Sequence, residues 1–182
     1  RILSSAASDV YKRQSLHSLI DEKKRKELDR PFDESTYFSS WMYPAVHLLF
    51  LSNEINSVDQ ISHRLKLEAS VVKAVVNDLL SWGLIEKNIH TVKVKQNRFH
   101  LSKSSSNITK NMHNWRSQAL IAMQNPEVLH DGLFFTHALM IREEDYQYLK
   151  IELRKLIEKF ETRLKSTTAE DLYCFNADVF RV

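Results

Sequence analysis

Two sets of polar and basic side chains between residues 70 and 103 have the chemistry needed to contact nucleic acid. The first set occupies outward positions of a predicted helix, between apolar residues that face inward: Ser70, Lys73, Ala74, Asn77, Asp78 and Ser81. Asn77 is the one candidate there for reading an adenine edge. The second set lies on or near a predicted hairpin: Lys87, Lys93, Lys95, Arg98 and Lys103. From both sets, the candidate DNA contacts are Ser70, Lys73, Asn77, Lys93, Lys95 and Arg98.

The charges in these sets predict weak binding without sequence preference. The helix offers one positive charge, Lys73, against one negative charge, Asp78, which would repel phosphates. The basic residues of the hairpin would contact the DNA backbone, which positions a protein without specifying sequence. A formal net charge of +3 permits contact with nucleic acid but does not demand it. DNA is therefore expected as a weak partner, held mainly through its backbone.

Catalytic, metal and cofactor motifs are missing from the sequence. The eight histidines show no metal-ligand spacing, and two glycines could hardly build a phosphate loop or a nucleophile elbow. The single cysteine, Cys174, excludes an internal disulfide, and its apolar segment favours a small buried side chain over a nucleophile. His113 and Trp115 lie in a helix between two subdomains, where packing is the default and a ligand pocket the alternative. We expect no enzyme, metal or cofactor.

Two short helices and a hairpin over residues 57–101 must position the candidate contacts. The first helix opens with a capping-box pair, Ser57 and Gln60, and carries an apolar stripe at Val58, Ile61 and Leu65. A turn at residues 66–68 leads to a second helix that stops at Gly83, the residue best suited to a left-handed helix end. This helix directs six apolar side chains inward: Val71, Val72, Val75, Val76, Leu79 and Leu80.

The hairpin follows this second helix without a loop. Leu84 and Ile85 resume as a strand, and alternation continues at Val92, Val94, Phe99 and Leu101. The whole order predicts a winged helix. A winged helix can also serve protein interaction or dimerisation, and a small helical core could bury itself and touch nothing, so the shape alone does not establish DNA binding.

The chain is expected to divide into three parts. Residues 1–14 include SSAASDVYKRQ, which looks like a translated adapter from sequence assembly, and a native N-terminal region is then missing. Residues 15–103 form the winged-helix domain with its leading helices, in which the basic run at 23–26 is a solvated face. The aromatic segment over residues 37–51 supplies the first helix of this domain, packed behind the other two, with Pro44 near the start of the helix over residues 44–51. Residues 104–182 form the C-terminal subdomain.

The C-terminal subdomain is predicted as a helix followed by a strand, a long helix and a second strand. The first helix spans residues 107–124 and turns five side chains inward: Ile108, Met112, Trp115, Ala119 and Met123. Apolar runs predict strands at residues 133–141 and 172–180, on either side of a helix over residues 143–165. This tail should pack against the helix of residues 107–124 or form a dimer contact. The fold class is thus α+β and mostly helical, a winged helix-turn-helix followed by a small strand-helix-strand subdomain.

The sequence resembles a bacterial family of transcriptional regulators whose C-terminal half is a winged-helix domain of unknown function. The resemblance covers residues 38–180 and rests on the order of four features: an aromatic helix around Tyr37, Trp41 and Pro44, the winged helix closing on residues 84–85, the helix containing His113, and the strand-helix-strand tail. Complete members carry a Cro-like helix-turn-helix ahead of this region, which would read DNA. Two departures lie in the tail: Arg142 replaces a common capping serine, and the chain ends in FRV where members run on through a proline.

The resemblance implies the C-terminal portion of a regulator, serving sensing, dimerisation or auxiliary DNA contact. The alternatives are a winged helix that itself binds DNA and a protein-interaction module without a nucleic-acid role. A homodimer is one expected partner arrangement, and the sequence does not specify a small-molecule effector. No apolar run approaches the roughly 20 residues of a membrane span and no signal peptide is visible, so we expect a cytoplasmic protein.

Overall fold

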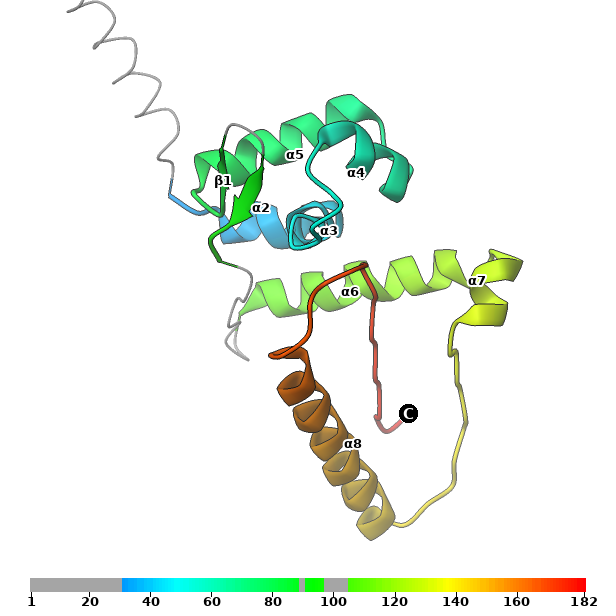
Figure 1. The fold of residues 1–182 in the computed structure, drawn as a ribbon. Coiled ribbons are helices and arrows are strands. Elements are labelled where there is room, and N and C mark those ends of the chain that lie inside the picture. The colour runs from blue at the N-terminus through cyan, green and yellow to red at the C-terminus, as the bar shows by residue number, and fades with distance from the viewer. Residues whose placement is uncertain (1–30, 89–90, 97–104) are drawn as a thin grey trace, which may run out of the picture.

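The computed structural model describes residues 31–88, 91–96 and 105–182 of the chain. This part is α+β and mostly helical, with a two-stranded antiparallel sheet (Figure 1). Helices α2 to α5 and the hairpin gather on one side of the long helix α6 (Figure 1). The expected adapter at residues 1–14 and the basic run at residues 23–26 lie outside the described residues.

Two short helices take the place of the single aromatic helix predicted over residues 37–51. Helix α2 (Glu34–Ser39) is capped by Asp33, whose carboxylate accepts a hydrogen bond from the Thr36 amide at 3.0 Å. Extended backbone at Ser40 then separates it from α3 (Met42–Leu49). Pro44 falls in the first turn of α3, where its missing amide removes no helical hydrogen bond.

Helices α4 (Val58–Leu65) and α5 (Ala69–Ser81) form where the sequence predicts them. The capping box is confirmed, since Ser57 Oγ accepts from the Gln60 amide at 3.3 Å and Gln60 Oε1 accepts from the Ser57 amide at 3.2 Å. Lys66 makes the turn between the two helices in the left-handed region, at φ 53°. Gly83 follows α5 at φ 68°, as expected for a helix that leads directly into a strand.

The hairpin consists of β1 (Ile85–Lys87) and β2 (Val92–Val94), paired antiparallel. Its register sets Ile85 opposite Val94 and Glu86 opposite Lys93. Beyond β2, the Lys95 amide donates to the Leu84 carbonyl at 2.9 Å and holds the returning chain against the end of α5. The predicted continuation through Phe99 and Leu101 lies outside the described residues.

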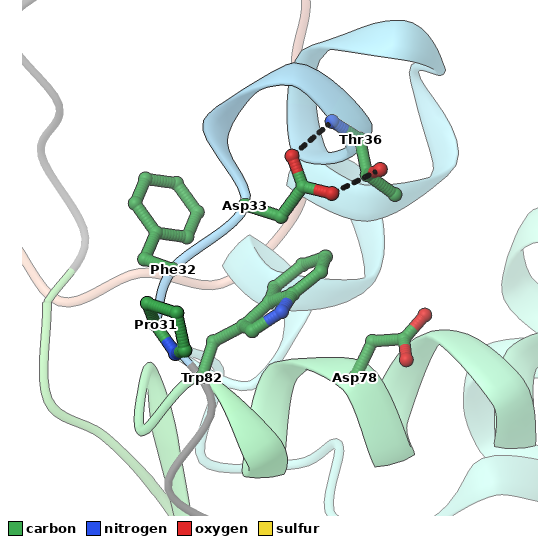
Figure 2. Close-up of a pocket in the computed structure, with 6 residues that line it drawn as sticks. All are labelled: Pro31, Phe32, Asp33, Thr36, Asp78 and Trp82. Carbon is green, nitrogen blue, oxygen red and sulfur yellow. Dashed lines mark hydrogen bonds between the residues drawn. The ribbon is translucent and has the colours of Figure 1, made fainter.

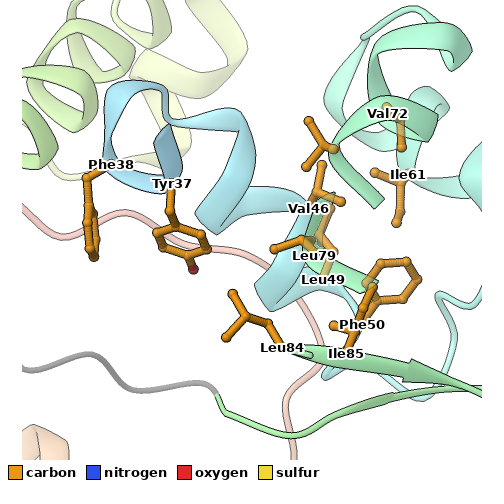
Figure 3. Packing of buried hydrophobic residues seen from close by; sticks show 11 residues of the cluster. Tyr37, Phe38, Val46, Leu49, Phe50, Ile61, Val72, Leu79, Leu84 and Ile85 are labelled. Carbon is orange, nitrogen blue, oxygen red and sulfur yellow. The ribbon is translucent and has the colours of Figure 1, made fainter. Parts of the chain in front are cut away.

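A single hydrophobic core joins α2 to α5 and the start of β1 (Figure 3). Ile61 of α4 meets Val72 and Leu79 of α5 within it, and all three are fully buried. Val71 was predicted to face inward on α5 but is 36% exposed, because side chains at neighbouring helix positions point about 100° apart. The other core residues are Tyr37, Phe38, Val46, Leu49, Phe50, Val75, Leu84 and Ile85.

The second half of the chain contains helices α6 (Ser106–Ala122), α7 (Pro126–Asp131) and α8 (Glu143–Leu164). Helices α6 and α8 form close to their predicted bounds, whereas α7 was not expected. Met112, predicted to face inward on α6, is 48% exposed. Asn125 and Pro126, interpreted as a helix end, also begin α7: the Asn125 side chain caps it and Pro126 takes its first position. Helix α6 lies against α2, where the Asn114 side chain donates to the Phe38 carbonyl at 3.0 Å.

The two strands predicted in the C-terminal subdomain are wrong. Residues 133–141 and 172–180 are extended but belong to no sheet (Figure 1). A strand needs a neighbouring strand to bond its amides and carbonyls, and the sheet of the described residues pairs only β1 with β2. Tyr173 is 86% exposed instead of lying on a covered face, and Cys174 is exposed instead of buried. Of the predicted strand-helix-strand unit, only the helix, α8, is therefore present.

The predicted tail contact with α6 is present without a strand. Asp178 pairs with Arg116 of α6, and the Asn176 side chain donates to the Trp115 carbonyl at 3.4 Å. Nearer the start of the C-terminal segment that follows α8, Asp171 pairs with Arg64 of α4. The last twelve residues thus cross α4 and α6 through exposed ion pairs, which individually contribute little stability.

Candidate nucleic-acid interface

The outward face of α5 exposes three of the predicted DNA contacts together. Ser70, Lys73 and Asn77 follow the spacing of three and four that sets residues on one side of a helix, and all three are exposed. Ala74 lies among them and is also exposed. On the opposite side of the helix, Val72, Val75 and Leu79 are buried, so this polar face is fixed toward solvent. Chemically, Lys73 can pair with a phosphate and Asn77 can bond an adenine edge.

Asp78 does not stand among these exposed residues as the sequence pattern suggested. It is partly buried, and its Oδ2 accepts a 2.7 Å hydrogen bond from the hydroxyl of Tyr43 in α3. Burial, and then this bond and the carboxylate charge, raise the pKa of Tyr43 to about 12. The negative charge expected to repel phosphates is therefore committed to holding α5 against α3. Ser81 is also partly buried, and its hydroxyl donates to the Asp78 carbonyl at 2.8 Å.

The hairpin exposes its lysines beside a carboxylate. Lys93 lies directly opposite Glu86 in the register, and Lys95 Nζ lies 3.2 Å from Glu86 Oε2. Lys87 is exposed at the end of β1. Glu86 therefore offsets part of the positive charge that the hairpin could offer to DNA. The predicted contact Arg98 and the nearby Lys103 lie outside the described residues.

A shallow hollow of about 510 Å³ opens between the start of α2 and the end of α5 (Figure 2). Two carboxylates line it, but Asp33 accepts bonds from the amide and hydroxyl of Thr36, and Asp78 is bonded to Tyr43. Phe32 and Trp82 meet edge to face across it, with ring centroids 5.8 Å apart. Pro31 completes the lining. With both of its carboxylates already bonded, the hollow is a seam between the start of α2 and the end of α5.

His47 of α3 is a fully buried titratable side chain that sequence reasoning did not single out. It has no exposed surface, and its Nδ1 lies 3.0 Å from the hydroxyl of Tyr37. Burial lowers the pKa of His47 to about 4, against a smaller raising effect of the Leu84 carbonyl. Burial also raises the pKa of the Tyr37 hydroxyl. The neutral pair therefore joins α2 to α3 inside the core. The only signal in the sequence is a histidine among apolar residues at core spacing.

The described residues also bear on metal binding and on membrane insertion. Within residues 31–88, 91–96 and 105–182, no group of three or more histidine, cysteine, aspartate or glutamate side chains could hold a metal ion. No helix of this part is long and apolar enough to span a bilayer. His113, considered at the sequence level beside Trp115, is exposed on α6, whereas Trp115 is partly buried. The described hollow lies away from both residues.

Comparison with known proteins gives one match. Residues 20–182 match a protein family described as a domain of unknown function, DUF4423. The match includes every helix and strand named above. No curated protein and no solved structure matches the sequence.

Proposed function

Since the chain belongs to the DUF4423 family, whose function is unknown, we propose a function from its own residues. The chain is the C-terminal portion of a bacterial transcriptional regulator. Helices α3 to α5 and the β1–β2 hairpin form a winged helix that makes auxiliary contact with the DNA backbone. Residues 105–182 serve sensing or dimerisation.

The exposed polar face of α5 is the observation that carries the DNA part of this proposal. In a winged helix the second helix of the pair enters the major groove and the hairpin lies beside it. Here α5 has one buried side and one exposed polar side with Ser70, Lys73 and Asn77, and a lysine-bearing hairpin follows it directly. The Tyr43–Asp78 bond removes one carboxylate from the contact face, which favours DNA contact more than the sequence alone suggested.

Weak, backbone-directed binding fits the charges available. Lys73, Lys87 and Lys93 are exposed, while Lys95 is paired with Glu86. If three lysines reach phosphates, the logarithm of the binding constant should fall with the logarithm of salt concentration with a slope of about −3. Asn77 alone could add direct base reading, and a single side chain would give little sequence discrimination.

A titration against DNA at several salt concentrations tests the proposal. The chain would be titrated with a duplex enriched for binding to it and with a scrambled duplex of equal length. We expect similar affinities for both, and Lys73→Ala should weaken binding to both and reduce the steepness of the salt slope by about 1. Lys110→Ala, which removes an exposed lysine from α6, is the matched control and should change neither.

Two outcomes would favour the alternatives. Tight binding to the enriched duplex that is lost in Asn77→Ala would make the winged helix itself the DNA reader. Absence of binding even at low salt would support a protein-interaction module, the alternative that the many exposed apolar side chains of residues 105–182 favour.

A further inference from the structure

The C-terminal region lacks an interior of its own. In residues 105–182, all of which the structure describes, no side chain is buried. Six aromatic side chains there are 53–86% exposed: Phe135, Tyr148, Phe160, Tyr173, Phe175 and Phe180. At roughly 200 Å² for each aromatic side chain, they leave about 800 Å² of surface uncovered. A standard protein interface covers about 800 Å² on each partner, so this region exposes enough apolar surface for one.

Helix α8 carries a continuous exposed apolar row. Leu156, Phe160 and Leu164 are spaced by four residues along one side and are 56%, 53% and 47% exposed. Further toward the N-terminus, the same stripe continues at Leu149 and Leu153, which are partly buried. Monomeric proteins rarely leave such a row uncovered, because removing apolar surface from water is favourable.

The charges beside this row change sign along the helix. Asp145, Glu152 and Lys159 are seven residues apart and therefore lie on one side of α8, with Arg163 one turn further on. The order is acid, acid, base, base. Asp145 and Glu152 pair with Arg142 and Lys155 only through exposed contacts on their own helix, which are weak. Within the described part of the chain, Lys159 and Arg163 form no ion pair.

We propose that α8 binds α8 of a second copy of this chain in antiparallel orientation. Under a twofold axis, the acidic end of each helix then faces the basic end of the other, whereas a parallel arrangement would set like charges together. The apolar rows lie between the two helices and cover each other. The inference deepens the dimerisation role proposed above by naming the partner and its orientation. It concerns α8 and needs no contact between the winged helix and DNA.

Charge reversal on α8 tests both the partner and the orientation, in the full chain and without DNA. The acid-reversed variant is Asp145→Lys with Glu152→Lys, and the base-reversed variant is Lys159→Glu with Arg163→Glu. Each alone should raise the dimer dissociation constant by about 100-fold, because both ends of an antiparallel pair then carry like charges. Sedimentation equilibrium over a dilution series measures the constant, and circular dichroism checks that α8 still folds.

Two rescues keep the test decisive even if single variants lose some stability. Mixing the acid-reversed and base-reversed variants should give a heterodimer, since every contact is again between opposite charges. Combining all four substitutions in one chain should restore the homodimer. Glu54→Lys with Glu68→Lys, at exposed positions outside the C-terminal region, makes the same change in net charge as the acid-reversed variant and should leave the dissociation constant unchanged.

Two results of these measurements would overturn the proposed α8 dimer. A wild-type chain that stays monomeric at all concentrations rules out the second copy as the partner. A dimer that both reversed variants leave intact rules out α8 as its interface. Neither result bears on DNA binding, so failure here and failure of the DNA proposal are measured separately.

Discussion

Lowering the pH should destabilise this protein through His47. The ring is fully buried beside the Tyr37 hydroxyl, and this burial lowers its pKa from 6.5 to about 4. In the unfolded chain the imidazole takes up a proton near pH 6.5, while in the folded chain it stays neutral down to about pH 4. The unfolded state therefore binds more protons in this window. The stability due to neutral His47 is complete above pH 6.5 and is lost as the pH falls toward 4.

The size of this effect follows from the pKa difference between the two states. Each unit of pKa difference corresponds to about 1.4 kcal/mol. Lowering the pH from about 7.5 to about 5 should thus cost about 2 kcal/mol of unfolding free energy, rising to about 3 kcal/mol near pH 4. A small domain has only about 5–15 kcal/mol of stability in total, so the loss should be plainly measurable.

Urea denaturation at a series of pH values measures this loss, and two variants isolate it. His47→Gln replaces the ring with a neutral amide that cannot take up a proton in this range, so its stability should change less with pH. The difference in slope between the wild type and this variant is the contribution of His47. His63→Gln removes an exposed histidine of α4 and controls for the loss of a histidine elsewhere. Identical pH profiles for the wild type and His47→Gln would refute the reasoning.

Two further substitutions test how the core is connected. Gly83→Ala should destabilise the protein by about 1 kcal/mol, because φ is 68° and an added Cβ meets nothing within 4 Å, so the cost is backbone strain alone. Gly83→Asn, a residue that tolerates this conformation, should cost less, and equal melting temperatures for Gly83→Ala and the wild type would contradict the assignment. Tyr43→Phe should cost about 1 kcal/mol in urea denaturation, because it leaves partly buried Asp78 without its hydroxyl donor. Tyr148→Phe, at an exposed position of α8, is the control and should cost nothing measurable.

Local signals in the sequence predicted the order of elements from α4 to the hairpin. Ser57 and Gln60 marked the start of α4, and Gly83 marked the end of α5. The reason is that caps and left-handed turns depend on hydrogen bonds and steric limits within a few residues. The outward positions of Ser70, Lys73 and Asn77 followed from helical periodicity alone. These features would be recognisable in an isolated segment of the same sequence.

The tertiary structure decided what depends on distant partners. Residues 133–141 and 172–180 have strand-like composition, but no strand of the described residues pairs with them to complete a sheet. The direction of Asp78 was set by Tyr43, thirty-five positions away in the chain, which no helical period encodes. His47 became a buried neutral base only because α2 and α5 close around α3. Local sequence determined which side chains of α5 face solvent. Packing against distant residues determined which of the charges on α5 are engaged in contacts with the rest of the protein.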